Sequence, residues 1–398
     1  MEGHGTAKDM QPHVLNDEGT VAGSHGTRRR SLQILAQGLA VPLVSFALAL
    51  LLGGVLIWST GGNPLAAYRA LLLGALVGRS NLELTVLNAT PLIFSGLAVA
   101  LAFRGGLFNI GAEGQVMLGG IVGAWLGSAL QLPPLVHIAV TLLAATLAGA
   151  LWAFPPAIFK VRRGAHEVIT TLMMSYVAFF LLAYVRKNIL LDPVSTTYSS
   201  FTISPSATLP TLSAILPFLH LGYTRVHLGV LIAPLIAAIV WFLLTRTSYG
   251  YEIRAVGVNP DAAAGNGINV GRITILSLVV GGALAGLGGG VQLLGLYRRL
   301  SVDSFVGLGF AGIFVSLLAG NHPLGVIPAA LLFGALQAGA FQMQLSANVP
   351  ANLVDALQGI IIFVIAAPRL AHLILSRIRR RGHHPDTGGR ASPARSIG

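Results

Sequence analysis

Residues 273–297 read ITILSLVVGGALAGLGGGVQLLGLY, and this stretch decides the fold class. It holds no charged residue and exceeds the roughly 20 apolar residues that a helix needs to cross a membrane. Gly282, Gly286 and Gly290 recur within it every four residues, so they share one helix face. Because lipid provides no hydrophobic drive for helices to associate, a stripe of small residues favours close backbone packing. The stretch predicts a membrane-spanning helix inside a bundle.

Comparable apolar stretches fill most of the chain. They lie at about residues 32–58, 82–103, 115–131, 134–159, 168–185, 226–245, 305–319, 324–345 and 351–368. With residues 273–297 they predict an all-α fold, a polytopic transmembrane helix bundle of about ten spans. The stretch at 305–319 is short enough for a tilted or broken helix, and residues 64–78 fit a helix at the outer membrane edge.

A second glycine stripe occurs in the stretch at 115–131. Gly119, Gly123 and Gly127 again recur every four residues. Tight helix packing is the simpler interpretation of both stripes, and a gating hinge is the alternative. Either way, the glycines predict a compact bundle whose helices can slide or rock.

The composition supports a membrane protein and excludes several other classes. Of 398 residues, 54% are hydrophobic and 10% are charged, whereas a soluble domain carries about 25% charged residues. The chain has no cysteine, which excludes disulfides, thiolate metal sites and cysteine nucleophiles. The net charge of +12 reflects basic residues between apolar stretches and in the tails, without interleaved aromatic residues. This pattern favours membrane orientation over nucleic-acid binding.

The placement of the basic residues also predicts the topology. Ten spans put both ends on one side, and most of the 25 Lys and Arg residues then fall on the side predicted to be cytosolic, as in multi-pass proteins of the cell membrane. We expect residues 1–31 to be a disordered cytosolic tail, 32–370 the transmembrane domain, and 371–398 a basic cytosolic tail. Within the domain, residues 188–225 are predicted to be an extracellular loop suited to an outside partner, and 246–272 a cytosolic loop.

No constellation for catalysis is recognisable. The three lysines are followed by Asp9, Val161 and Asn188, so the chain lacks the G-x-x-x-x-G-K-[ST] loop that binds phosphates. The H-E-x-x-H and G-x-S-x-G motifs are also absent. His383 and His384 in the tail are better interpreted as solvated residues than as a metal site. The sequence therefore predicts a non-enzymatic protein without a metal or a bound cofactor.

Polar side chains near apolar segments are the candidate pathway residues, since burying charge in a bilayer is costly. Asn109, Glu113 and Gln115 lie in a segment where four glycines weaken a regular helix, so its backbone can line a cavity. The alternative is that Glu113 caps the helix that follows. Asp355 and Gln358 share one face of the last predicted span.

The loop at 246–272 carries signals for two short helices. Tyr249 to Val256 can form one helix that ends at Gly257. Asn259, Pro260 and Asp261 suit the N-cap, the first position and the first turn of a second helix, which Gly265 or Gly267 then ends. Two capped helices would form a rigid knob suited to docking a partner; an ordinary structured loop is the alternative. The candidate docking residues are Tyr249, Glu252, Arg254, Gly257, Asn259, Pro260, Asp261 and Gly267.

These residues also carry a family resemblance. RAVGVNP at 254–260, followed by Gly267 and Ile268, resembles the coupling loop of ABC-transporter permeases of the branched-chain amino acid/simple-sugar class. LFNIGAEGQ at 107–115 resembles the signature of its nucleoside/simple-sugar (ribose-like) permeases. Further similar segments are EVITTLM at 167–173, GALAGL at 282–287, NHPLG at 321–325 and FGALQAG at 333–339. The resemblance covers about residues 32–370. It departs at His166 and near Ser175, where the family usually has Asn, and His166 is a further candidate pathway residue.

The resemblance implies a permease subunit of an ATP-driven importer for a nucleoside or a simple sugar. It implies three protein partners: an ATP-binding subunit docked on residues 249–268, a second homologous permease, and an extracellular substrate-binding lipoprotein. ATP and Mg²⁺ would be bound by the first partner, and membrane lipids would surround the chain. Two alternatives remain at this point. One is an ion-coupled carrier that uses Glu113 and Asp355, and the other is an intramembrane enzyme, for which a nucleophile–base or metal set is lacking.

Overall fold

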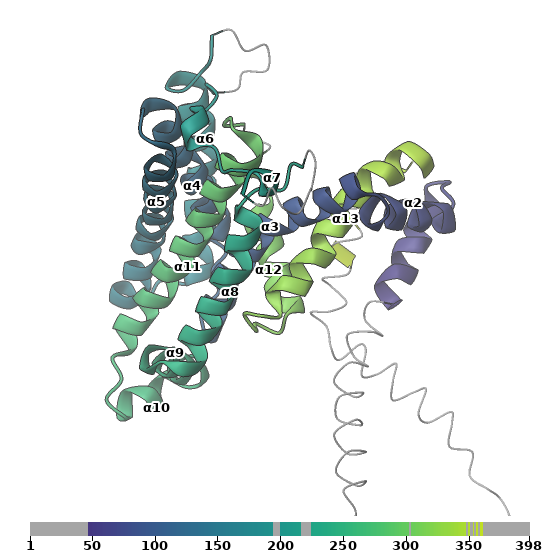
Figure 1. The fold of residues 1–398 in the computed structure, drawn as a ribbon. Helices are drawn as coiled ribbons and strands as arrows, with labels where there is room; N and C mark the ends of the chain where they lie inside the picture. Colours follow the sequence, from purple (N-terminus) through teal and green to yellow (C-terminus); the bar gives the residue numbers. More distant parts are fainter. Residues whose placement is uncertain are drawn as a thin grey trace, which may run out of the picture.

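The computed structural model describes residues 47–193, 200–215, 224–301, 304–347 and parts of 349–360. These residues form helices and loops without a β-strand (Figure 1). The first helix is Ala47–Ser59. It is followed by α2 (Pro64–Leu76), α3 (Arg79–Arg104), α4 (Ala112–Ala129), α5 (Pro134–Arg163), α6 (Glu167–Asn188), η1 (Pro205–Ala207), α7 (Leu212–Ile215), α8 (Gly229–Arg246), α9 (Ser248–Val258), α10 (Pro260–Gly265), α11 (Val270–Gln292), η3 (Leu293–Tyr297), α12 (Leu308–Leu318) and α13 (Val326–Ala347).

The predicted all-α membrane fold is confirmed. Among the described residues, six helices are long and apolar enough to cross a membrane: α3, α5, α6, α8, α11 with η3, and α13. The count is seven if Ala47–Ser59 and α2 form one span bent by 118°. The ten spans and the cytosolic position of both ends stay predictions. Most of the last predicted span, with Asp355 and Gln358, lies outside the described residues.

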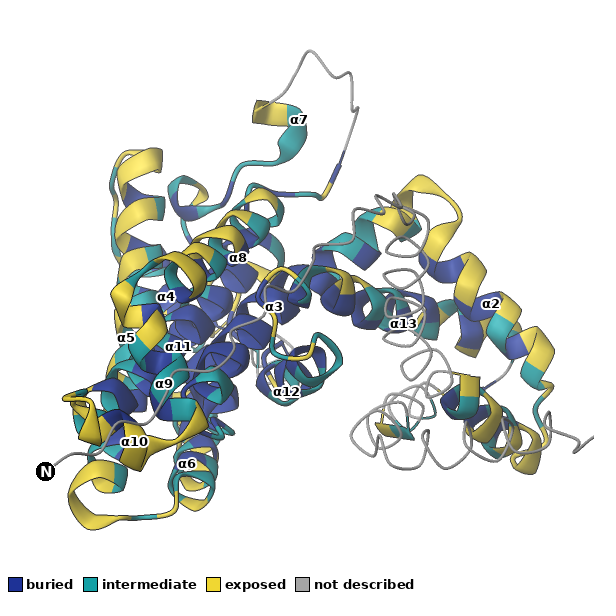
Figure 2. Cartoon of the chain, turned by 90° about the horizontal axis from the view of Figure 1, so that it is seen from below, coloured by how far each residue is buried: buried dark blue, intermediate teal, exposed yellow. Residues whose placement is uncertain are grey.

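Two helices that fall outside this set still lie within the bundle. α4 is almost wholly buried and packs against α5, α6, α11 and α12, and α12 has only 11 residues. Of the most apolar 18 residues of α3, 83% are buried inside the structure. The corresponding shares for α5, α6 and α8 are 22%, 28% and 28%. Figure 2 shows the same difference as a dark core around α3 and yellow outer faces on α5 and α8. The exposed faces are rich in Leu, Val and Phe, as contact with lipid requires.

The glycine stripes place α11 against α4 and α5. A β-carbon on Gly286 would lie 2.4 Å from the Ala145 carbonyl oxygen of α5, and one on Gly282 would lie 2.5 Å from that of Gly149. A β-carbon on Gly119 of α4 would lie 2.0 Å from the Gly286 oxygen. The backbones therefore touch at these positions. Gly290 faces the Ala145 side chain, Gly123 faces Leu293, and Gly127 faces Ile203 in the segment between α6 and η1.

The described part of the predicted outer loop is packed onto the helix ends. The Ser204 amide donates to the Gly127 carbonyl at 2.7 Å, and the Leu209 amide donates to that of Leu294 at 3.0 Å. His137 of α5 is 2.9 Å from the Ser206 hydroxyl. Ile203 and Leu209 are buried. This segment thus covers the ends of α4, α5 and η3.

Candidate functional site

Glu113, in the first turn of α4, joins α4 to the beginning of α12. Its side chain is buried, and its carboxylate accepts hydrogen bonds from the backbone amides of Gly307 (2.5 Å), Gly309 (2.7 Å) and Phe310 (3.1 Å). The first amides of a helix have no partner within that helix, and a negative charge is favourable there. Glu113 therefore caps a different helix from the one that the sequence suggested.

Close approach between the two segments depends on Gly309. A β-carbon at this position would lie 2.1 Å from the Glu113 nitrogen, so any side chain would push α12 away from α4. The turn before α12 contains Gly307 at φ +89°, a backbone conformation that residues with a β-carbon rarely adopt. These two glycines bring the amides of α12 to the carboxylate.

Asn109 and Gln115 form a reciprocal amide pair. Asn109 donates to the Gln115 oxygen at 3.0 Å, and Gln115 donates to the Asn109 oxygen at 3.2 Å. Both side chains are buried, and burial of such groups requires hydrogen-bond partners. The pair fixes the segment that leads into α4, and neither side chain lines the cavity described next.

A cavity of about 270 Å³ lies beside Glu113. Its lining comes from α4, from α6, and from the region where α12 begins; the residues are Glu113, Met117, Ser175, Tyr176, Phe179, Phe180, Val306 and Phe310. Four of these eight residues carry an aromatic ring, and Glu113 is the one ionisable carboxyl group. Of the candidate pathway residues Asn109, Glu113 and Gln115, Glu113 is the one that lines this cavity.

The aromatic lining was missed by sequence reasoning. Tyr176 and Phe180 are four residues apart, so they share a face of α6, but in a span this spacing is equally expected of lipid-facing residues. Both are more than half exposed in the isolated chain. Phe310 belongs to a segment more than 100 residues away, and no local pattern connects it with α6.

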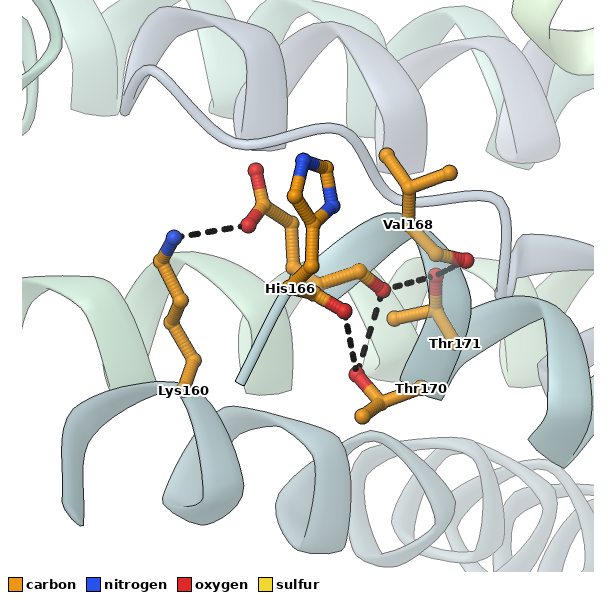
Figure 3. Close-up of polar contacts among 6 residues, drawn as sticks. Lys160, His166, Val168, Thr170 and Thr171 are labelled. Carbon is orange, nitrogen blue, oxygen red and sulfur yellow. Dashed lines mark hydrogen bonds and ion pairs between the residues drawn. The ribbon is translucent and has the colours of Figure 1, made fainter. Parts of the chain in front are cut away.

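His166 does not line this cavity. His166 is exposed at the N-cap position of α6. It neighbours the ion pair of Lys160 and Glu167, whose charged atoms are 2.8 Å apart (Figure 3). The hydroxyls of Thr170 and Thr171 donate to backbone carbonyls in the same turn. A role for His166 in the pathway stays a prediction, and Asp355 lies outside the described residues.

The second candidate site is the knob formed by α9 and α10. The Asn259 side chain accepts hydrogen bonds from the amides of Asp261 and Ala262, both at 3.0 Å, and Pro260 occupies the first position of α10. The Thr247 hydroxyl accepts from the Gly250 amide at 3.1 Å and so caps α9. These contacts explain why the segment folds into two short helices with a tight junction.

The predicted end of α9 at Val256 was wrong by two residues, with a physical reason. α9 continues through Gly257 to Val258. A β-carbon on Gly257 would lie 2.1 Å from the Arg104 carbonyl oxygen. Gly257 therefore lets α9 pack directly on the backbone at the end of α3 and does not terminate the helix.

One side of the knob is anchored and the other is open. Ile253, Val256 and Ala263 are buried against the bundle, and the Arg272 guanidinium lies 5.8 Å from the centre of the Tyr249 ring. Glu252 and Arg254 are half-buried, and the exposed residues include Tyr249, Tyr251, Val258, Asn259, Pro260, Asp261 and Gly267. The knob is a firmly held projection with a mixed polar and apolar surface.

The sequence is similar to known transport proteins along most of its length. A family model described as branched-chain amino acid transport system / permease component matches residues 81–366. The chain is 38% identical to the guanosine ABC transporter permease protein NupP of Bacillus subtilis (strain 168), over 86% of this chain and 97% of that protein. It is 35% identical to the nucleoside ABC transporter permease protein NupB of Lactococcus lactis subsp. cremoris, over 85% and 93%. It is 33% identical to the glucose ABC transporter permease protein TsgB13 of Haloferax volcanii, over 81% and 86%.

The match covers the helices that build the cavity and both helices of the knob. Members of this family are permease components of ABC transporters and work together with other components of the system. The chain belongs to the family of branched-chain amino acid transport system permease components, and it is an integral membrane transport subunit, not an enzyme.

Proposed function

We propose that this chain is a permease subunit of an ABC importer that carries nucleosides across the cell membrane. The observation that carries the proposal is the 38% identity to a guanosine permease along 86% of the chain, together with an aromatic cavity beside Glu113. Glucose is the second candidate substrate, because the glucose permease TsgB13 is also similar, at 33% identity.

The knob is the proposed site where an ATP-binding subunit docks. Its outer surface is exposed and its inner surface is anchored on the ends of α3 and α11. The sequence lacks a phosphate-binding loop, so ATP hydrolysis would occur in the partner. A movement of the knob would be transmitted to α4 and α12 through α3, because α3 packs against α9 as well as against α4 and α12.

Two further partners complete the proposal. A second homologous permease would cover part of the exposed apolar surface that the isolated chain presents on α6. An extracellular substrate-binding lipoprotein would contact the loop at 188–225, whose described part lies over the helix ends opposite the knob (Figure 1). In this proposal the chain crosses the membrane ten times and both of its ends are cytosolic, so the knob lies on the cytosolic side and the loop at 188–225 on the extracellular side.

Reconstituted uptake tests the function directly. The chain is assembled with its ATP-binding subunit, the second permease and the binding lipoprotein in proteoliposomes, and labelled guanosine or glucose is offered. We expect guanosine uptake that requires ATP and persists when proton and sodium gradients are collapsed. Uptake of guanosine that follows an ion gradient without ATP would overturn the importer and favour the ion-coupled carrier. ATP-dependent uptake of glucose but not guanosine would replace the proposed substrate by the second candidate.

A further inference from the structure

We propose that the cavity between α4, α6 and the beginning of α12 holds the aromatic base of the transported nucleoside, while the sugar stays outside it. This inference rests on the proposed function and deepens it by assigning a binding subsite for one half of the substrate. The first support is the ring content of the lining: Tyr176, Phe179 and Phe180 come from α6, and Phe310 comes from α12.

The arrangement of the rings suits a flat ligand. The ring centroids of Phe179 and Phe180 are 5.5 Å apart, and the two ring planes are inclined at 78° to each other. A ligand that lies against the face of one ring therefore meets the other ring at its edge. Phe310 contributes a ring from a separate helix. Every nucleobase has a π-face that can stack on such rings, whatever its sequence of polar groups along the edge.

The polar groups of the lining disfavour a sugar in the same place. The Glu113 carboxylate already accepts three backbone hydrogen bonds. The Ser175 hydroxyl accepts from the Gly114 amide at 3.3 Å and lies within donor distance of the Thr171 carbonyl, at 3.2 Å. The third polar group of the lining is the Tyr176 hydroxyl, which is too little for a sugar that carries hydroxyls all round its ring. A base carries its polar groups on its edge and can turn its apolar faces to the rings, so it leaves fewer buried polar groups unsatisfied.

The charge and the size of the cavity further restrict which ligand can bind in it. The Glu113 charge faces the N-terminal end of α12, where it is already offset, so the cavity suits a neutral ligand. Its volume of about 270 Å³ lies just below the range for pockets that hold a whole drug-sized ligand, about 300–1,000 Å³. The space fits a base better than a complete nucleoside, and we therefore place the sugar towards the open side.

The test compares variants that remove a ring but keep apolar bulk. Phe179→Leu and Phe310→Leu are assembled with the partner subunits, and ATP-dependent uptake of labelled guanosine is measured in proteoliposomes. We expect KM to rise about tenfold in each, as loss of one stacked ring predicts. The ring-keeping variant Phe179→Tyr should stay within about twofold of wild type. Phe242→Leu on the exposed face of α8 is the matched control and should leave KM unchanged.

A second measurement on the wild-type complex removes dependence on variant folding. Photolysis with 8-azidoguanosine should label peptides that contain residues 173–180 or 306–310, and excess unlabelled guanosine should prevent the labelling. Labelling confined to other segments would overturn the base site, as would an unchanged KM in both ring-free variants. In those cases wild-type guanosine uptake remains, so the proposed function stands; if wild-type guanosine uptake is absent, the proposed function fails and the base site fails with it.

Discussion

At the scale of single residues, one carboxylate connects two helices that are far apart in the sequence. Glu113 stands in α4, and its three amide partners lie at residues 307–310. Hydrogen bonds to a charged group contribute more than neutral ones, about 1.5–3 kcal/mol each. The contact is therefore a strong local link between α4 and α12, and it forms one wall of the aromatic cavity.

Glu113→Gln tests this link. The neutral amide keeps one acceptor oxygen and brings an NH₂ group against backbone donors, so at least one of the three hydrogen bonds is lost. We expect the variant to insert and assemble, to unfold more easily by about 2 kcal/mol, and to transport guanosine with altered kinetics. Thermal unfolding of the purified chain and uptake by the reconstituted complex measure the two effects.

Glu167→Gln is the matched control for that substitution. It removes a carboxylate from a single ion pair with Lys160, in which the Lys160 side chain is 35% and the Glu167 side chain 12% exposed. Ion pairs that water can reach contribute only about 0–1 kcal/mol. A control as strongly destabilised as Glu113→Gln, or unchanged transport in Glu113→Gln, would contradict a special role for the α4–α12 link.

At the scale of elements, the knob owes its shape to two caps and one close approach. Asn259 begins α10, Thr247 begins α9, and Gly257 lets α9 touch the end of α3. The caps follow from local chemistry and were predictable for α10. The contact of Gly257 with Arg104 was not, because nothing in the nearby sequence indicates which backbone lies opposite.

Gly257→Ala should displace the knob. Its methyl group would collide with the Arg104 carbonyl, so α9 must shift or tilt, at a cost of about 1–3 kcal/mol. We expect less ATP-binding subunit to co-purify with the variant and ATP-dependent uptake to fall, whereas membrane insertion should be unchanged. Arg254→Glu should weaken the same association, because it reverses a charge on the knob.

Gly265→Ala provides the comparison within the knob. A β-carbon at Gly265 meets no other atom within 4 Å, so the added methyl group should be tolerated. Wild-type recovery of the ATP-binding subunit with both Gly257→Ala and Arg254→Glu would refute docking on the knob.

At the scale of the whole molecule, the knob and the described part of the loop at 188–225 lie at opposite ends of the bundle (Figure 1). The aromatic cavity is lined by α4, α6 and the start of α12 between these ends. The loop, the cavity and the knob thus follow one another along the bundle. This arrangement suits a transporter that takes up substrate at one end and is driven by an ATP-hydrolysing partner at the other. Its orientation in the cell membrane is open to a direct test.

The absence of cysteine makes single-cysteine labelling of the topology straightforward. With a membrane-impermeant maleimide, we expect Thr202→Cys to react in intact cells. Ala262→Cys in the knob and Ser24→Cys and Ser392→Cys in the two tails should react only after permeabilisation. Labelling of Ser392→Cys but not Ser24→Cys in intact cells would show an odd number of spans; labelling of Ala262→Cys in intact cells would reverse the orientation.

The sequence by itself determined the membrane class, the helical fold, the glycine stripes and the paired helices of the knob. These features depend on apolar length, helical spacing and cap chemistry, which act over a few residues. The tertiary structure alone decided that Glu113 caps α12, that Asn109 and Gln115 satisfy each other, and that Phe310 meets the rings of α6. Such contacts join segments separated by many residues, and their geometry is set by how whole helices pack, which local chemistry does not specify.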